Sequence, residues 1–312
     1  MNLKQLQHFV ALAESGNVHK GSSMLSISQP ALSKSIRALE EDLDVQLFER
    51  FSRGVRLTPV GQWLLSRSFS LLSDIQQLRT EIDLIKRQTN GSVRIAAGTV
   101  LCSSLIPLCL ARLHEVASNV QVTVESGYWN DHKRLLLNGE IDFFVADSRE
   151  LEDIIEFDIA QLPAEPICAY ARLGHTLSKK RKLTLTDLGE YAFSGLTRLP
   201  KELERILKAY PELPASRLTA ATISSNDFGL LRSSAALTDI LFFSPPSAVR
   251  DQVARKELVK LNLMLPTQLQ THFAIVWLKG RKLSTSAELM KHTIVECAAE
   301  QFQASPCGKT KS

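Results

Sequence analysis

Apolar residues near the start of the chain recur at helical spacing and predict three helices. The first helix ends at Ser15-Gly16, a pair typical of turns. A second, short helix follows, and Ser26-Ile27-Ser28 supplies a break and an N-cap for a third. Pro30 falls in the first turn of that helix, where its missing N–H costs little. The inward positions are Leu3, Leu6, Val10 and Ala13; then Val18, Ser22 and Leu25; then Leu32, Ile36 and Leu39.

A short hairpin is predicted after the third helix. Leu47–Arg50 and Val55–Thr58 have the composition of strands, and Ser52-Arg53-Gly54 between them is a turn sequence. The tip of this hairpin carries an arginine beside a glycine. Three helices followed by such a wing predict a winged helix-turn-helix over residues 1–58.

A long helix should follow the wing. Thr58 before Pro59 is an N-cap with proline at the first helical position, and the next proline is Pro107. Apolar residues then alternate in steps of four and three, interrupted by a serine: Leu64, Ser68, Leu71, Ile75, Leu78, Ile82 and Ile85. At 1.5 Å per residue, about 30 residues form a rod of roughly 45 Å. Asn90-Gly91 is suited to a left-handed cap and a hinge.

This helix could pack on the domain that follows it or pair with a second copy of the chain. A seam sustained over several turns favours pairing. We therefore predict that residues 59–90 form a linker helix and hinge that make the protein a homodimer.

After Gly91 the pattern changes to alternating strands and helices. The first set is the strands Val93–Ala96, Val120–Val124 and Ile141–Val145 with the helices Ser104–Ala117 and Asp131–Asn138. After Pro163 come the strands Pro166–Ala171, Ile240–Phe243 and Thr271–Leu278 with the helices Lys201–Ala209, Asp227–Ala236 and Ser286–Gln301. This alternation predicts a parallel α/β sheet, which binds ligands at the carboxyl ends of its strands.

The chain is therefore expected to be an α/β multidomain protein, since 312 residues are more than one core usually holds. An α/β domain would span residues 91–302 in two parts, called lobe I (91–163 and 268–302) and lobe II (164–267). Residues 303–312 have the composition of a flexible tail.

The third predicted helix has a second face suited to DNA. It is small, polar and cationic, and consists of Gln29, Pro30, Ser33, Lys34 and Arg37. Glutamine and arginine can bond two atoms of a base edge, serine can bond either edge, and lysine pairs with phosphate. The net charge is only +4, so the placement of charge decides the interpretation. A solvated face of a plain three-helix bundle would also be polar.

Charge placement favours DNA. Between Glu14 and Glu40 there is no acidic residue, and between Glu49 and Asp74 there is again none. The basic residues inside these two windows include Lys20, Lys34 and Arg37, then Arg50, Arg53, Arg56 and Arg67. An arginine on a wing can reach a narrow minor groove or its flanking phosphates.

The stretch LKQLQHFVALAESGN…SISQPALSKSIRALEEDLDVQLFER…RGVRLTPVGQWLL resembles the DNA-binding domain of the LysR-type transcriptional regulators. SQPALSKSIRALE, LFER and RGVRLT match many positions at set spacing. The resemblance implies that Gln29, Pro30, Ser33, Lys34 and Arg37 face the major groove, that Arg53 acts from the wing, and that helix 59–90 is the dimer contact. The resemblance also implies that two dimers can form a homotetramer and that RNA polymerase is a possible partner.

Two segments depart from the family. Where the family has an aromatic residue and then alanines, this chain has Val18 and then Gly21-Ser22-Ser23. Because glycine and serine lower helix propensity by up to roughly 1 kcal/mol, we expect this helix to be less stable than usual. Later, Leu237-Thr238-Asp239-Ile240 replaces a glycine-rich turn.

The C-terminal part resembles the family's two-lobed effector domain, similar to periplasmic binding proteins. Its clearest marker is Leu135…Asn138-Gly139-Glu140-Ile141-Asp142. Pocket candidates follow the predicted strands: Gly98, Thr99, Cys102 and Ser103; Tyr128 and Trp129; and Thr197 and Arg198 from lobe II. Free N–H groups and hydroxyls at a helix start can hold an anion, so we expect a polar or anionic small-molecule effector. Each of these residues could also be ordinary loop chemistry.

Three alternatives remain. A redox-responsive regulator could act through Cys102, although Cys102 and Cys109 would lie about 10 Å apart on one helix, too far for an unstrained disulfide. An architectural binder would ignore DNA sequence. An α/β enzyme is disfavoured because G-x-S-x-G, P-loop, G-x-G-x-x-G and H-E-x-x-H motifs are absent from the sequence. We expect no catalytic activity, cofactor or metal.

The five cysteines include no C-x-x-C pair, which indicates reduced thiols rather than a disulfide framework. No signal peptide and no apolar run near 18 residues is present in the sequence. We therefore expect a cytoplasmic protein without membrane contact, whose partners are double-stranded DNA, a small molecule and its own copies.

Overall fold

The computed structural model describes residues 1–51, 54–87, 91–149, 151, 154–197, 221–264 and 269–303. The chain divides into two compact units, Met1–Gln88 with Arg134–Glu140, and Thr89–Lys133 with Ile141–Ser312. The division lies next to the predicted hinge. In the described part of the chain, no helix has the length and apolarity needed to cross a membrane.

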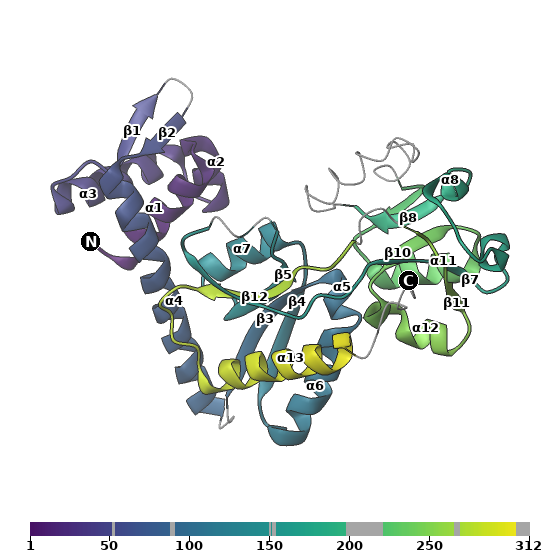
Figure 1. The fold of residues 1–312 in the computed structure, drawn as a ribbon. Helices are drawn as coiled ribbons and strands as arrows, with labels where there is room; N and C mark the ends of the chain where they lie inside the picture. Colours follow the sequence, from purple (N-terminus) through teal and green to yellow (C-terminus); the bar gives the residue numbers. More distant parts are fainter. Residues whose placement is uncertain are drawn as a thin grey trace. The chain divides into compact units, whose positions relative to one another are not determined.

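The N-terminal unit has the predicted three helices, hairpin and long helix (Figure 1). They are α1 (Leu3–Ser15), α2 (Val18–Met24), α3 (Gln29–Leu43), β1 (Phe48–Phe51), β2 (Gly54–Leu57) and α4 (Pro59–Arg87). Ser28 Oγ accepts from the Ala31 N–H (3.3 Å), and Thr58 Oγ1 accepts from the Gly61 N–H (3.0 Å). Both predicted caps are therefore confirmed, and the winged helix-turn-helix is the observed fold.

A tight fit explains the unusual glycine of α2. A Cβ at Gly21 would lie 2.9 Å from Ser15 Oγ and 3.3 Å from Leu32 Cδ2. Gly21 and Ser22 are both buried, so α2 packs closely against α1 and α3 at this point. Gly21 therefore lowers the helix propensity of α2 but also allows the helix to pack this closely, which only the tertiary structure reveals.

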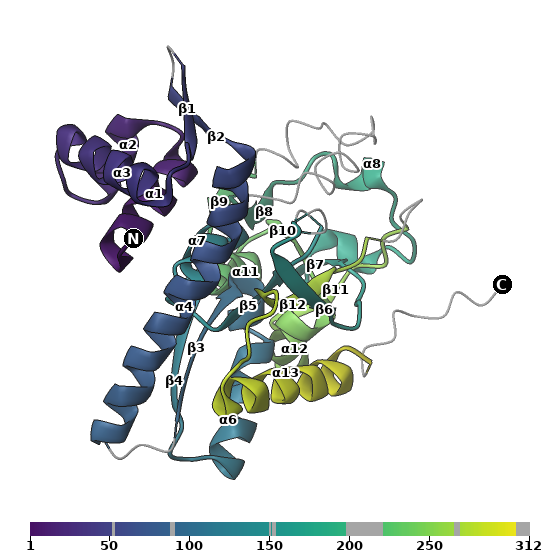
Figure 2. The same ribbon diagram turned by 90° about the vertical axis from the view of Figure 1, so that its left-hand side faces the viewer.

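Helix α4 is one continuous helix (Figure 2). Its first turns pack within their own unit, because Leu64, Ser68 and Phe69 are buried there. The buried Ser68 hydroxyl donates to the Leu64 carbonyl (2.7 Å), so its polarity is satisfied inside the helix. Further along, Leu71 and Leu78 are exposed. Ile75 is half-buried, and the side chains of Ile82 and Ile85 lie outside the described residues.

Lobe I of the second unit is built on a five-stranded sheet of order β4-β3-β5-β12-β6. The strands are β3 (Ser92–Gly98), β4 (Gln121–Gly127), β5 (Phe143–Asp147), β6 (Phe157–Gln161) and β12 (Phe273–Leu278). β3 pairs in parallel with β4 and β5, whereas β12 runs antiparallel to β5 and β6. The expectation of a parallel sheet was therefore wrong for β12, which returns from lobe II in the opposite direction.

Helices cover both faces of this sheet (Figure 1). α6 (Leu105–Val116) and α13 (Thr285–Gln303) share one apolar core with the inward side chains of β3, β5 and β12. On the opposite face, α7 (Trp129–Leu137) buries His132 against Phe144. The marker Asp142 is structural, because its carboxylate accepts from the Arg94 N–H (2.8 Å) and from Arg281 (3.3 Å).

Lobe II has a second mixed sheet of order β11-β7-β10-β8-β9. Its strands are β7 (Cys168–Arg172), β8 (Phe193–Leu196), β9 (Ile223–Ser225), β10 (Leu241–Ser244) and β11 (Leu258–Lys260). Its helices are α8 (Leu185–Leu188), α11 (Phe228–Leu237) and α12 (Arg250–Ala254), with single turns at Thr176–Lys179 (η1) and Pro246–Val249 (η2). The predicted helix Lys201–Ala209 lies outside the described residues.

The predicted tail begins one residue too early, because Gln303 is the last residue of α13. Residues 304–312 lie outside the described residues.

The buried histidine of α7 gives lobe I a pH dependence. Neither ring nitrogen of His132 has a hydrogen-bond partner among the described residues. Burial lowers the pKa of His132 from 6.5 to about 4. Between these pH values the unfolded chain binds more protons than the folded one, so stability should fall by about 3 kcal/mol as pH drops from about 6.5 to about 4.

The substitution His132→Leu should flatten that dependence, because leucine cannot be protonated. Chemical denaturation of the full chain at several pH values measures it. His114→Leu, at an exposed position of α6, is the matched control and should leave the profile unchanged. An unaltered pH profile in His132→Leu would contradict the assignment.

Candidate nucleic-acid interface and pocket residues

Helix α3 separates an apolar face from a polar one. Leu32, Ile36 and Leu39 are buried against the rest of the unit. On the other side, Gln29, Pro30, Lys34 and Arg37 are exposed and Ser33 is half-buried. Within the described residues, the side chains of this face form no hydrogen bond or ion pair. A rigid helix therefore presents donors, acceptors and cations that the fold itself does not use.

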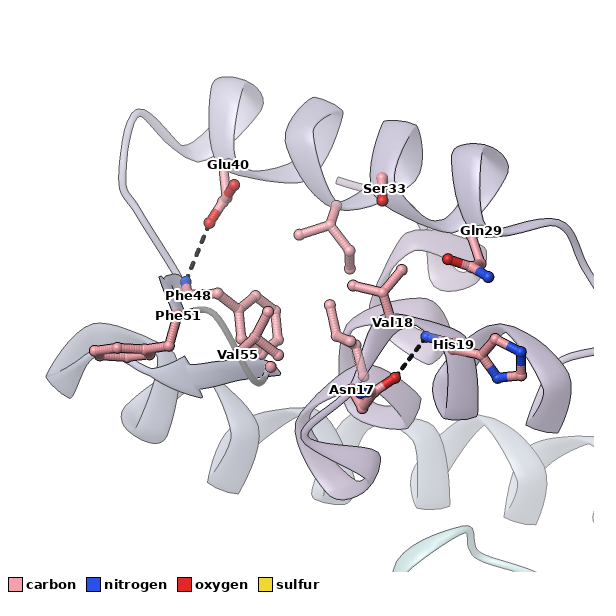
Figure 3. Close-up of a pocket in the computed structure, with 12 residues that line it drawn as sticks. Asn17, Val18, His19, Gln29, Ser33, Glu40, Phe48, Phe51 and Val55 are labelled. Atoms are coloured by element: carbon pink, nitrogen blue, oxygen red, sulfur yellow. Dashed lines mark hydrogen bonds between the residues drawn. The ribbon is translucent and has the colours of Figure 1, made fainter.

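A hollow of about 360 Å³ lies beside this face, between α3, the start of α2 and the wing (Figure 3). Its polar lining includes Asn17, His19, Gln29 and Ser33. His19 is exposed and was not singled out from the sequence. The sequence signal that could have identified His19 was its place in the first turn of α2, after the N-cap Asn17, in a window without acidic residues.

The wing is attached to the helices by backbone hydrogen bonds. The Val55 N–H donates to the Gly16 carbonyl (2.9 Å), in the left-handed turn that ends α1. At the base of the hairpin, Glu40 Oε1 accepts from the N–H groups of Leu47 (2.8 Å) and Phe48 (3.1 Å). The predicted Arg53 lies outside the described residues, so its contact with DNA stays a prediction.

In lobe I, the pocket candidates gather at one sheet edge. β3 and β4 end side by side, with Gly98 opposite Gly127. Thr99 and Cys102 bound the short helix α5, and Ser103 follows it. Tyr128 and Trp129 do not end the strand as expected, because β4 stops at Gly127 and Trp129 begins α7.

The geometry of Cys102 disfavours redox chemistry. Its thiol is half-buried and donates to the Ala97 carbonyl (3.4 Å). Burial raises the pKa of the Cys102 thiol, and a hydrogen bond with Ser126 offsets only part of this effect. A thiol held in its protonated form is a weak nucleophile.

Lobe II meets lobe I at α5. Val100 packs against the lobe II core that contains Phe228 and Leu231, together with Leu196 and Ile223. Sequence reasoning did not single out Val100, since a lone valine in a segment predicted as a loop carries no signal. Thr197 is exposed just after β8, and its N–H donates to the Ser225 carbonyl (3.2 Å). Arg198 lies outside the described residues.

Two segments connect the lobes, and Glu165 and Thr271 join them by hydrogen bonds of the backbone N–H groups. The Glu165 N–H donates to Thr271 Oγ1 (3.0 Å), and the Thr271 N–H donates to the Glu165 carbonyl (2.9 Å). The Glu165 carboxylate also accepts from the Ser247 N–H (3.1 Å) and from the Ser247 hydroxyl. Burial raises the pKa of Glu165. The two connecting segments thus form one hydrogen-bonded hinge attached to lobe II.

Comparison with known proteins agrees with this architecture. Residues 3–62 match the bacterial regulatory helix-turn-helix protein domain of the lysR family, and residues 86–298 match the LysR substrate binding domain. The "SDS degradation transcriptional activation protein" of Pseudomonas sp. (strain ATCC 19151) is 32% identical over 298 residues, covering 95% of this chain and 96% of that protein.

Two solved structures share the fold. A full-length OxyR variant from Pseudomonas aeruginosa has a TM-score of 0.62 at 23% identity, covering 98% of this chain and 99% of the other. Full-length CbnR in complex with its target DNA has a TM-score of 0.50 at 19% identity, covering 96% of this chain and 100% of the other.

A winged helix-turn-helix joined to a two-lobed α/β domain defines a ligand-responsive DNA-binding regulator. This chain belongs to the LysR family of transcriptional regulators. Its N-terminal unit is the DNA-binding domain, and its second unit contains the effector-binding domain. The family consists of transcriptional regulators rather than enzymes.

Proposed function

We propose that this regulator reads its operator through Gln29, Pro30, Ser33, Lys34 and Arg37, with Arg53 contributing from the wing. The observation that carries this proposal is the unpartnered polar face of α3, held in place by buried Leu32, Ile36 and Leu39. In the free protein water binds these exposed groups, and base edges in the major groove can replace that water because they match the donors and acceptors of the face.

Dimerisation through α4 belongs to the same proposal. Leu71 and Leu78 are exposed on the helix beyond the turns that pack in their own unit. Apolar residues at coiled-coil spacing gain stability when a second copy covers them. Two α3 helices would then meet two half-sites of one operator.

We further propose that the effector is a small organic anion bound beside α5. The N–H groups of Gly98 and Thr99 and the hydroxyls of Thr99 and Ser103 lie where β3 ends, and Tyr128 follows the neighbouring strand. Such groups can bind carboxylate or sulfate oxygens. The relative named for the degradation of SDS supports an organic sulfate as the first chemistry to examine.

A thermal-shift experiment on the full chain tests the effector proposal. Hexyl sulfate and hexanoate, well below micellar concentration, are compared with hexanol. At saturation the anions should raise the melting temperature of the second unit by roughly 5–11 °C, because a ligand at about 100 times its Kd adds about 2.7 kcal/mol.

The variant Thr99→Val should lose most of that shift, whereas Thr123→Val, exposed in the middle of β4, should keep it. Stabilisation by hexanol or larger apolar compounds alone would overturn the assignment of an anionic effector.

A further inference from the structure

Phe51 is a large aromatic residue left exposed on the wing. It is the last residue of β1, its side chain is 55% exposed, and it pairs with Gly54 on the opposite strand. Because glycine has no side chain, Phe51 is the bulky group at this end of the described hairpin. A single exposed apolar side chain is common on protein surfaces, so what indicates a contact here is the place of Phe51 on the wing and its neighbours.

Strand alternation directs Phe51 away from the protein core. Phe48 and Leu57 face each other in the register, and Phe48 is buried against Phe9 at a ring distance of 5.3 Å. Phe51 lies three residues further and points to the other face, away from Phe48 (Figure 3). Its ring is therefore not part of the domain core.

A cation accompanies the ring. The Arg56 guanidinium carbon lies 5.4 Å from the Phe51 ring centroid, on the same face of the hairpin. The exposed Glu49 faces Arg56 across the hairpin, and the next acidic residue along the chain is Asp74. An aromatic ring next to a positive charge suits a polyanion with apolar sugars, and DNA has both features.

The wing also holds Phe51 at a set distance from the recognition helix. The Val55–Gly16 hydrogen bond and the Glu40 contacts tie the hairpin to α1 and α3. The wing and α3 form opposite walls of the hollow that contains Gln29 and Ser33. With α3 in a major groove, a DNA strand can follow this hollow, and the wing then meets the adjacent minor groove.

We propose that Phe51 is a DNA-contacting residue of the wing, which packs its ring on the sugars and base edges of that minor groove. Apolar side chains in a minor groove favour steps that unstack easily, so Phe51 contributes preference for pyrimidine–purine steps there. The proposal rests on the DNA-binding function and adds a specificity residue to it.

The test uses the full chain and an operator selected by the wild type from a random duplex library. Phe51→Ala should weaken binding to that operator about tenfold or more, with little change in its salt dependence, because no phosphate contact is lost. Phe51→Trp keeps an aromatic ring at this position and should bind the operator about as tightly as the wild type does. Arg56→Gln should instead reduce the salt dependence.

Met24→Ala is the matched control, since Met24 is 54% exposed on α2, and it should bind as the wild type does. Replacing the pyrimidine–purine steps beside the α3 site with an A-tract should weaken the wild type more than Phe51→Ala. Unchanged affinity in Phe51→Ala overturns the proposal. So does a change in oligomeric state without loss of DNA affinity, which would assign the ring to a protein contact. An operator preference that Gln29→Ala and Ser33→Ala leave unchanged would instead count against the operator-reading face of α3.

Discussion

The substitutions Gln29→Ala and Ser33→Ala together are expected to lower affinity for the selected operator by roughly a hundredfold while leaving binding to random duplex nearly unchanged. A good side-chain contact to a base edge is worth about 1–3 kcal/mol of discrimination. Gln29 is exposed at the start of α3, and Ser33 follows one turn later on the wall of the hollow. Neither side chain supports the fold, so the expected loss lies in recognition.

Salt-matched gel shifts on the selected operator and on random duplex measure this effect. Gln7→Ala on the exposed side of α1 is the control for removing a surface glutamine and should not alter either affinity. Arg53→Ala should weaken both duplexes alike, since a phosphate contact carries no sequence information. Equal losses on both duplexes for the Gln29 and Ser33 variants would show an architectural binder and sink the prediction.

The substitution Gly54→Ala should both destabilise the N-terminal unit and weaken binding to every DNA sequence. Gly54 has a φ of +146°, a backbone conformation that L-residues rarely adopt, and a Cβ there would lie 2.4 Å from the Gly16 carbonyl oxygen. That oxygen also accepts from the Val55 N–H, so the added methyl forces the wing away from its attachment. Strain and the lost hydrogen bond together should cost about 2–4 kcal/mol.

Amide exchange of the segment 54–57 in the full chain measures the loss of protection at Val55, and gel shifts measure affinity. Gly280→Ala is the control for positive φ alone, because Gly280 has a φ of +74° and no atom lies within 4 Å of its added Cβ. That variant should cost about 1 kcal/mol in its own unit and leave DNA binding intact. If the two variants behave alike, steric contact with Gly16 is not what positions the wing.

The sequence predicted well those features that depend on neighbouring residues. Ser28 and Thr58 act as N-caps through hydrogen bonds to N–H groups three residues later, and that requirement is readable from local order. The apolar stripe of α3 and the alternation of strand and helix in lobe I likewise follow from side-chain periodicity. These local rules were enough to predict a winged helix-turn-helix and an α/β domain, and to select the polar face of α3, whereas the division into two lobes came from the resemblance to the family.

The sequence could not predict features that depend on distant residues. β9 and β11 span three residues each, too short to show a period, and they exist because β8 and β7 pair with them. The antiparallel direction of β12 is set by the path of the chain back from lobe II. The same limit applies to the contact between the lobes, where Val100 packs against a core that starts at Cys168 and reaches Leu258.

For DNA binding, the sequence by itself determined the chemistry of the reading face, because residue types and helical spacing decide which side chains share it. The tertiary structure decided how that face is framed. The approach of Gly54 to Gly16, the hollow beside Gln29 and Ser33, and the exposure of Phe51 all arise from packing between segments far apart in the chain.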